Sequence, residues 1–111
     1  MSTWKELTFP TSTSDCLEIT DARVDLLLDD LRWQVLEIIE SGKTVGELSK
    51  ALGVTDARLL WHLERIASTG VLHLQKDGSD RTEWLCVPSV RTLRVDVTDS
   101  SSIRRIGMST R

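Results

Sequence analysis

The sequence has only two cysteines, Cys16 and Cys86, and no long run of apolar residues. The cysteines lie far apart in the sequence, which does not indicate a disulfide scaffold. The absence of a long apolar run argues against a transmembrane helix, and the first residues lack the charged and then apolar pattern of a secretion signal. We therefore expect one small cytoplasmic domain, because 111 residues can build a single modest core.

The sequence also lacks the residue patterns on which most enzymes depend. It contains no nucleophile paired with a base, no phosphate-binding loop and no catalytic pair of carboxylates. We therefore expect no enzyme activity, no catalytic residues and no cofactor.

Positive charge is scarce in most of the chain. Residues 1–87 contain 9 Lys and Arg and 15 Asp and Glu, whereas residues 88–111 contain 5 Arg and 2 Asp. Nucleic-acid-binding proteins usually carry a basic patch that neutralises phosphates, so the acidic balance argues against strong non-specific binding. A local basic face remains open, because five cations fall in residues 44–87: Lys50, Arg58, Arg65, Lys76 and Arg81.

Residues 44–70 carry the local signals of two helices joined by a tight corner. Thr44 and Glu47 have the spacing of a capping box, in which each side chain hydrogen-bonds the backbone of the other residue. Gly53 can adopt the left-handed conformation that ends a helix, and Thr55 can cap the next one. Apolar residues at intervals of four and three predict the buried stripe of the second helix: Leu59, Leu63 and Ile66.

A hairpin and two flanking segments complete the pattern. Residues 71–76 and 83–87 are predicted to be strands around a turn at 77–80, where Gly78 supplies a positive φ. Upstream, Thr20 is expected to cap a short helix, and Asp29 or Asp30 the next one. After Pro88, alternating apolar residues at 93, 95 and 97 predict a short strand, and residues 99–111 are expected to be mobile.

These patterns predict a mainly α fold with a small β-wing, within the α+β class: a winged helix-turn-helix. We expect an N-terminal arm at residues 1–19, the winged helix-turn-helix domain at residues 20–87, and a partly disordered C-terminal extension at residues 88–111.

Three segments carry a resemblance to a known family. LLLDDLRWQVLEII resembles the opening helix of ArsR-type (arsenic-repressor-like) transcription regulators, Leu-Ala-Asp-Pro-x-Arg-x-x-Ile-Leu. TVGELSKALGVT and WHLERIASTGVL resemble the helix before the turn, and the recognition helix with the first wing strand. The resemblance covers residues 28–87 and implies a sequence-specific DNA-binding regulator, in the usual case a repressor.

The second helix would then enter the major groove of double-stranded DNA. Its outward residues are expected to contact bases: Ala57 or Leu60 a thymine methyl, Asp56 a cytosine amino group, and Arg58 a guanine or a phosphate. Lys76 and Arg81 of the wing are expected on phosphates. The full set of candidate DNA-binding residues is Thr55, Asp56, Ala57, Arg58, Leu60, Trp61, Arg65, Lys76 and Arg81.

Other interpretations of the same residues remain open. An exposed pair formed by Leu60 and Trp61 would instead suit a protein-interaction module that has lost DNA binding, since aromatic anchors are favoured at interfaces. A regulator of this kind is expected to be a homodimer that reads two half-sites, with residues 16–28 and 88–97 as its interface.

Metal-sensing members of the family place Cys-x-Cys in the helix before the turn, where this chain has ELSKAL. We therefore expect no metal site and no response to zinc, arsenic or cadmium. His62 is interpreted as a partly buried packing residue and His73 as a strand surface residue. Cys16 and Cys86 are interpreted as unreactive packing thiols, although a redox-sensitive disulfide or a zinc site shared by two copies would also use them.

Overall fold

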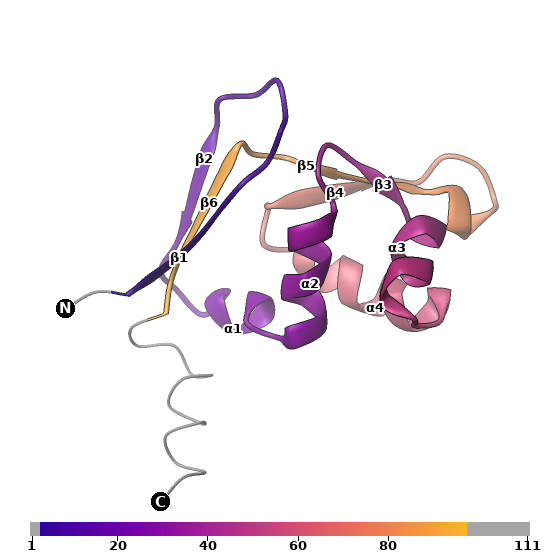
Figure 1. The fold of residues 1–111 in the computed structure, drawn as a ribbon, viewed down its shortest axis with the longest axis horizontal. Coiled ribbons are helices and arrows are strands. Elements are labelled where there is room, and N and C mark those ends of the chain that lie inside the picture. Colours follow the sequence, from indigo (N-terminus) through magenta and orange to yellow (C-terminus); the bar gives the residue numbers. More distant parts are fainter. Residues whose placement is uncertain (1–2, 98–111) are drawn as a thin grey trace, which may run out of the picture.

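The computed structural model describes residues 3–97. Figure 1 shows one small sheet to the left of a group of helices, and a second sheet that runs along the top of that group. The elements follow the chain as β1 (Trp4–Thr8), β2 (Cys16–Ile19), α1 (Val24–Leu27), α2 (Asp30–Ile38), β3 (Lys43–Thr44), α3 (Val45–Leu52), α4 (Asp56–Ala67), β4 (Leu72–Gln75), a 3-10 turn (Arg81–Glu83), β5 (Leu85–Pro88) and β6 (Thr92–Asp96).

The fold is α+β with mixed content, and the prediction of a mainly α fold was wrong. Of the described residues, 38% are helical and 25% lie in strands, in four helices and two small sheets. The difference comes from the segment predicted to be an N-terminal arm. It contributes β1 and β2, which pair with β6 to form a three-stranded sheet in the order β1-β6-β2. The segment predicted to be mobile, 99–111, lies outside the described residues.

This first sheet, called sheet A below, has one apolar and one polar face. Antiparallel β1 and parallel β2 flank β6, so that Leu7 and Leu17 both lie beside Leu93 in the register. Successive side chains of a strand point to opposite faces, and the outer face carries Arg94, which forms ion pairs with Glu6 and Glu18 on the two neighbouring strands. Because the outer face is polar, the sequences of β1 and β2 contain no continuous apolar stretch that would have indicated a strand.

Sheet B, in the order β3-β5-β4, contains the predicted hairpin. Both wing strands are present, but the second begins at Leu85, because Arg81–Glu83 forms a 3-10 turn capped by Asp80. Gly78 has the positive φ expected in the turn. Residues 89–91 connect β5 directly to β6, so that a single stretch of chain joins the two sheets (Figure 1).

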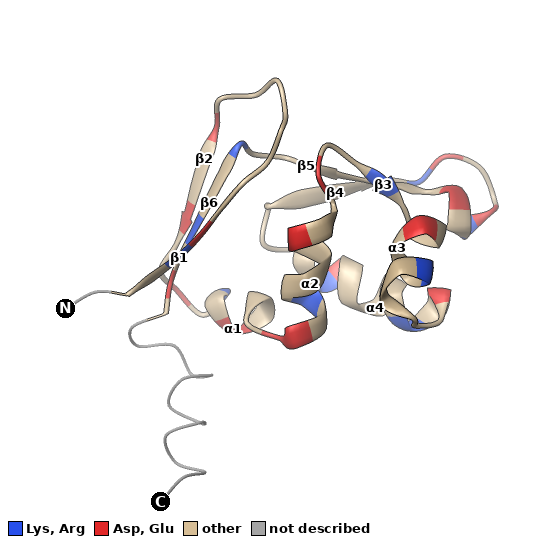
Figure 2. Cartoon of the chain, in the orientation of Figure 1, with Lys and Arg blue, Asp and Glu red and all other residues tan. Residues whose placement is uncertain are grey.

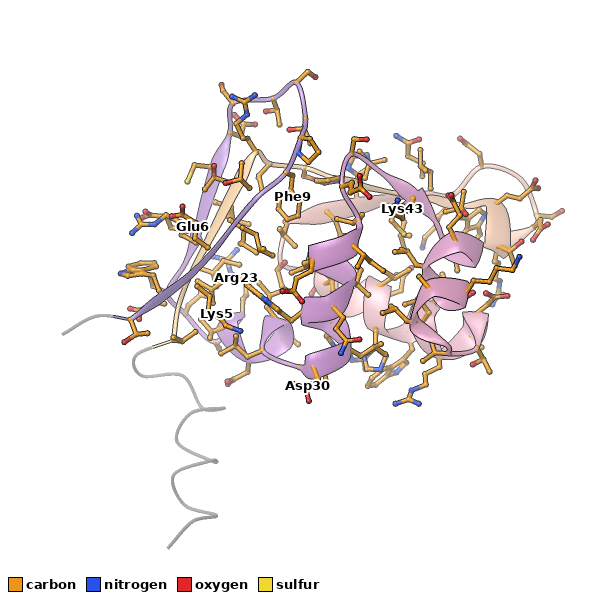
Figure 3. All side chains as sticks on the ribbon, in the orientation of Figure 1. Lys5, Glu6, Phe9, Arg23, Asp30 and Lys43 are labelled. Atoms are coloured by element: carbon orange, nitrogen blue, oxygen red, sulfur yellow. The ribbon has the colours of Figure 1, made fainter. Side chains whose placement is uncertain are left out.

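One apolar core lies between the sheets and the helices. Buried residues come from all four helices and from both sheets. Phe9, which directly follows β1, is buried and points toward the helices and sheet B, whereas Glu6 points away from the helices (Figure 3). Sheet A is therefore part of the same packed unit as the helices. No helix among residues 3–97 is long and apolar enough to cross a membrane.

The local helix signals were mostly predicted correctly. Thr44 and Glu47 form the capping box, and Gly53 ends α3 in the left-handed conformation. Thr55 caps α4, and Asp29 caps α2 by accepting from two backbone N–H groups. The cap predicted at Thr20 was wrong, because α1 begins at Val24 without a side-chain cap.

Candidate nucleic-acid interface

A short turn fixes α4 against α3. Residues 53–55 separate the two helices, and the Thr55 hydroxyl accepts from the backbone N–H of Arg58. Across the turn, the Ser49 hydroxyl donates to an oxygen of Asp56 at 2.6 Å. Asp56 is half-buried and already engaged in this bond, so its carboxylate holds the corner together. The expectation that Asp56 faces outward, free to accept from a cytosine, does not fit this geometry.

The buried side of α4 is wider than the predicted stripe. Leu59, Leu63 and Ile66 are fully buried as expected, but Leu60 is also buried, with 8% of its surface exposed. The helix contacts α1, α2, α3 and β4, so neighbours pack against it from several sides. The expectation that Leu60 faces outward was therefore wrong. Ala57, Arg58, Trp61 and Glu64 are the exposed residues in the first three turns.

Trp61 lies at the centre of the outer face of α4. Its side chain is 51% exposed, and it is the one large hydrophobic side chain that is exposed among the described residues. The guanidinium carbon of Arg65 lies 3.4 Å from the centroid of the Trp61 ring, and Nη1 of Arg65 donates to the Trp61 carbonyl. The guanidinium carbon of Arg32 lies 5.6 Å from the same ring. Such cation–aromatic contacts hold both partners in place.

A buried hydrogen bond joins α2 to α4 beside this tryptophan. Nε of Arg32 donates to Nδ1 of His62 at 3.0 Å, and Nη1 of Arg32 donates to the Leu26 carbonyl at 2.9 Å. Because Nδ1 accepts, His62 is neutral in this arrangement. Burial is the main cause that lowers the pKa of His62, and the nearby positive charge of Arg32 lowers it further. His62 is thus a buried residue of the helix interface, as predicted.

Sequence reasoning missed Arg32. The available signal was its spacing: Arg32 precedes Val35, Leu36 and Ile39 by three, four and seven residues, which places it on the buried face of α2. An arginine on an apolar face either points its charged end back to solvent or finds polar partners within the core. The structure shows the second outcome, since Arg32 is 8% exposed and makes two hydrogen bonds.

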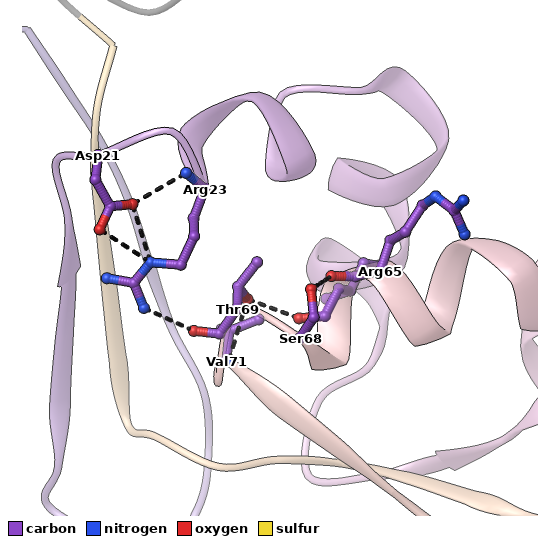
Figure 4. Close-up of polar contacts among 7 residues, drawn as sticks. Asp21, Arg23, Arg65, Ser68, Thr69 and Val71 are labelled. Carbon is purple, nitrogen blue, oxygen red and sulfur yellow. Dashed lines mark hydrogen bonds and ion pairs between the residues drawn. The ribbon is translucent and has the colours of Figure 1, made fainter.

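Hydrogen bonds also hold the C-terminal end of α4. Nη1 of Arg23 donates to the Thr69 carbonyl, and Asp21 holds the same guanidinium through its Nε (Figure 4). The hydroxyl groups of Ser68 and Thr69 donate to carbonyls of the last turn of α4. The helix is therefore fixed at both ends and along its inner side.

Besides the packing of β4 against α4, an ion pair joins the wing to α4. Nζ of Lys76 lies 3.0 Å from Oε1 of Glu64, and the same ammonium lies 5.5 Å from the Trp84 ring. Nε1 of Trp84 donates to the Gly78 carbonyl, which holds the turn of the hairpin. Lys76 is thus already paired, whereas Arg81 is exposed and its side chain makes no hydrogen bond or ion pair within residues 3–97.

Basic and acidic positions are interspersed along the elements of the described chain (Figure 2). Lys50 is exposed in the last turn of α3 and Arg58 in the first turn of α4, whereas Arg65, in the last turn of α4, is half-buried. The electrostatic effect of Arg32, Arg58 and Arg65 on His62 has the same sign, and all three lower its pKa. Arg32 contacts His62 and lies near the Trp61 ring, Arg65 lies over that ring, and Arg58 is one helical turn before Trp61. We call Arg32, Arg58, Trp61, His62 and Arg65 the Trp61 cluster.

The cysteines differ in their environments, and only one fits the expected packing role. Cys86 is buried in sheet B, and burial raises the pKa of its thiol to about 12. Cys16 is exposed at the start of β2, so the prediction of a packing thiol was wrong for this residue. Both thiols are free. Within residues 3–97, we find no group of three or more potential ligands that could hold a metal ion.

We expect iodoacetamide at pH 8 to alkylate the folded protein once. Cys16 is open to solvent, whereas the buried thiol of Cys86 is protonated at this pH and cannot act as a thiolate nucleophile. Intact-mass spectrometry of the native protein should show a single adduct, and Cys16→Ser should show none until denaturant is added. Two adducts on the native protein at equal rates would contradict the burial of Cys86.

No protein-family model matches this chain, and no curated protein is found that matches it.

Proposed function

We propose that this chain is a sequence-specific, double-stranded DNA-binding transcription regulator of the winged-helix, ArsR-like type. The main support for the proposal is the placement of α4. It is fixed to α3 by a capped three-residue turn, it presents Arg58, Trp61 and Arg65 outward, and the β4–β5 hairpin follows it. A helix positioned in this way can enter the major groove while the hairpin contacts the flanking backbone.

The described contacts favour different roles for the candidate residues. Ala57 and Arg58, near the start of α4, are exposed and suited to base edges, where arginine pairs with guanine. Leu60 and Asp56 hold the fold, as does the capping hydroxyl of Thr55. Arg81 is available to a phosphate, and Lys76 would first have to leave Glu64.

The alternative, a protein-interaction module, loses part of its support. It required an exposed apolar pair, and the burial of Leu60 leaves Trp61 alone, covered on the ring by the guanidinium of Arg65. A single aromatic residue among arginines suits a nucleic-acid surface better than an apolar protein interface.

The homodimer is also a proposal, and its expected interface needs revision. Val24, Leu27, Leu93 and Val95, which lie in the segments 16–28 and 88–97, are buried in the core of the single chain. The proposal therefore rests on the twofold symmetry of DNA half-sites. Sedimentation equilibrium at tens of micromolar, with and without duplex DNA, distinguishes a dimer from a monomer.

DNA binding can be tested by fluorescence anisotropy with duplex fragments at a series of salt concentrations. We expect the logarithm of the affinity to fall linearly with the logarithm of salt concentration, because phosphate contacts release counterions. Arg58→Gln should weaken binding and change sequence preference by about 1–3 kcal/mol if Arg58 reads a base. Arg91→Gln, which removes the same charge from an exposed residue before β6, is the matched control.

In the wing, Arg81→Gln should weaken the binding of all duplexes alike, and by more than Lys76→Gln. The reason is that Lys76 is already paired with Glu64, whereas Arg81 is not engaged within the described residues. Failure of the native protein to bind any duplex at low salt would instead support the interaction module.

A further inference from the structure

Arg32 is a buried cation for which the described residues supply no carboxylate partner. It is 8% exposed, and its hydrogen bonds go to two neutral acceptors, Nδ1 of His62 and the Leu26 carbonyl. None of the ion pairs found among residues 3–97 includes it. Removing a charge from water is costly unless opposite charge compensates for it. Within residues 3–97 the charge of Arg32 is therefore uncompensated, and a bound anion would compensate it.

Two further guanidinium groups lie on the solvent side of Arg32. Arg65 is stacked on the Trp61 ring and hydrogen-bonded to the Trp61 carbonyl, so its position is fixed before any ligand arrives. Arg58 lies one turn before Trp61 on the same face of α4 and is exposed. Neither forms an ion pair in the described part of the chain. Asp29 is the acidic group that acts on His62 in the opposite sense to these arginines.

The Trp61 cluster is therefore locally positive in a chain that is acidic overall. Three guanidinium groups and one carboxylate act on the same imidazole, whereas residues 1–87 as a whole have more acidic than basic side chains. Arginine has a planar, weakly hydrated group that matches the oxygens of a phosphate in pairs. The neighbouring ring of Trp61 holds the Arg65 guanidinium in place and so reduces the side-chain entropy that binding would cost.

We propose that Arg65, Trp61 and Arg32 of the Trp61 cluster form a binding site for a phosphodiester group of the DNA backbone, separate from the base-reading start of α4 that carries Arg58. This inference rests on the proposed function. Arg65 donates to the phosphate oxygens at the surface, and Trp61 holds Arg65 in place. Arg32 lies beneath them as a fixed charge, whose effect is strong because little water surrounds it. The outer face of α4 at Trp61 and Arg65 thus rests on one DNA strand and reads no sequence.

The decisive experiment measures duplex binding by fluorescence anisotropy over a range of NaCl concentrations, with several unrelated duplexes. Arg65→Gln should weaken all of them to a similar degree, and should reduce the steepness of the salt dependence by about one counterion. Arg65→Lys keeps the charge and should retain most of the steepness. Arg91→Gln, the matched charge control, should bind as the native protein does.

The variants of Arg32 must separate an effect on DNA affinity from an effect on folding. Arg32→Met should bind every duplex several-fold more weakly under conditions where circular dichroism shows that it is folded, and Arg32→Lys should bind more tightly than Arg32→Met. If Arg32→Met does not fold, the Arg65 variants decide alone. One result would overturn this site and leave the proposed function standing. In it, the native protein binds duplexes in a salt-dependent way, and Arg65→Gln and folded Arg32→Met bind them with the same affinity and salt dependence. If the native protein binds no duplex at low salt, the proposed function itself fails.

Discussion

Replacing Leu93 by alanine should lower the free energy of unfolding by about 2–5 kcal/mol. Leu93 is fully buried at the centre of β6, beside Leu7 of β1 and Leu17 of β2. Its removal leaves a cavity where sheet A meets the helices. Since a small domain has only about 5–15 kcal/mol of stability in total, this single change should remove a large part of it.

Urea unfolding followed by circular dichroism and tryptophan fluorescence provides the measurement. Thr92→Ala is the matched control, because Thr92 precedes Leu93 on β6 and lies on the outer face of sheet A. Thr92→Ala should lower the free energy of unfolding by much less than Leu93→Ala does. If the two signals unfolded at different urea concentrations, or if the cost of Leu93→Ala stayed below that of the control, sheet A would not share the core of the helices.

Replacing His62 by phenylalanine should lower the free energy of unfolding by about 1.5–3 kcal/mol at neutral pH, the usual value of a hydrogen bond to a charged group. Phenylalanine keeps a ring beside Trp61 but cannot accept from Nε of Arg32, which then remains buried with one partner fewer. His62→Gln supplies a side-chain oxygen that can accept in its place. It should therefore cost less than His62→Phe.

The same residue should make stability depend on pH. The pKa of His62 is lowered in the folded protein, first by burial and then by Arg32, so the unfolded chain binds this proton more readily than the folded one. The contribution of His62 to the free energy of unfolding is therefore fully present at pH values above the ordinary imidazole pKa. It is lost as the pH falls from there through the lower pKa that His62 has in the folded protein. His62→Gln should lose this part of the pH dependence, and His73→Gln, on the exposed side of β4, should keep it. An identical pH profile for native protein and His62→Gln would contradict the assignment.

Signals that act within a few residues could be predicted from the sequence. Thr44 and Glu47 cap each other, Gly53 ends α3, and Thr55 begins α4, because each of these interactions needs only the local backbone. The stretch from α3 through β4 and β5 was therefore predicted well. The limits of the wing were less exact, since Asp80 and Thr82 form a tight turn that shortens the second strand.

Features that depend on distant parts of the chain could not be predicted in this way. β1 has five residues and acquires its place only by pairing with β6, which lies near the other end of the described chain. Leu60 looks exposed on a helix considered alone, and it is buried because several elements pack around α4. Arg32 gains its role from His62, thirty residues further along. Such long-range packing overrides local preference.

The pairing of sheet A has a consequence for the order in which the chain can fold. β1 and β2 each pair with β6 and with no other strand of the described residues. During synthesis they therefore have no hydrogen-bonding neighbour until residue 96 has emerged, while α3, α4 and the hairpin can form from local contacts. Contacts between distant parts of a chain form late and slow folding. β1 and β2 are thus made before β6 but can pair only after it, and until then both edges of β6 lack these hydrogen-bonding neighbours.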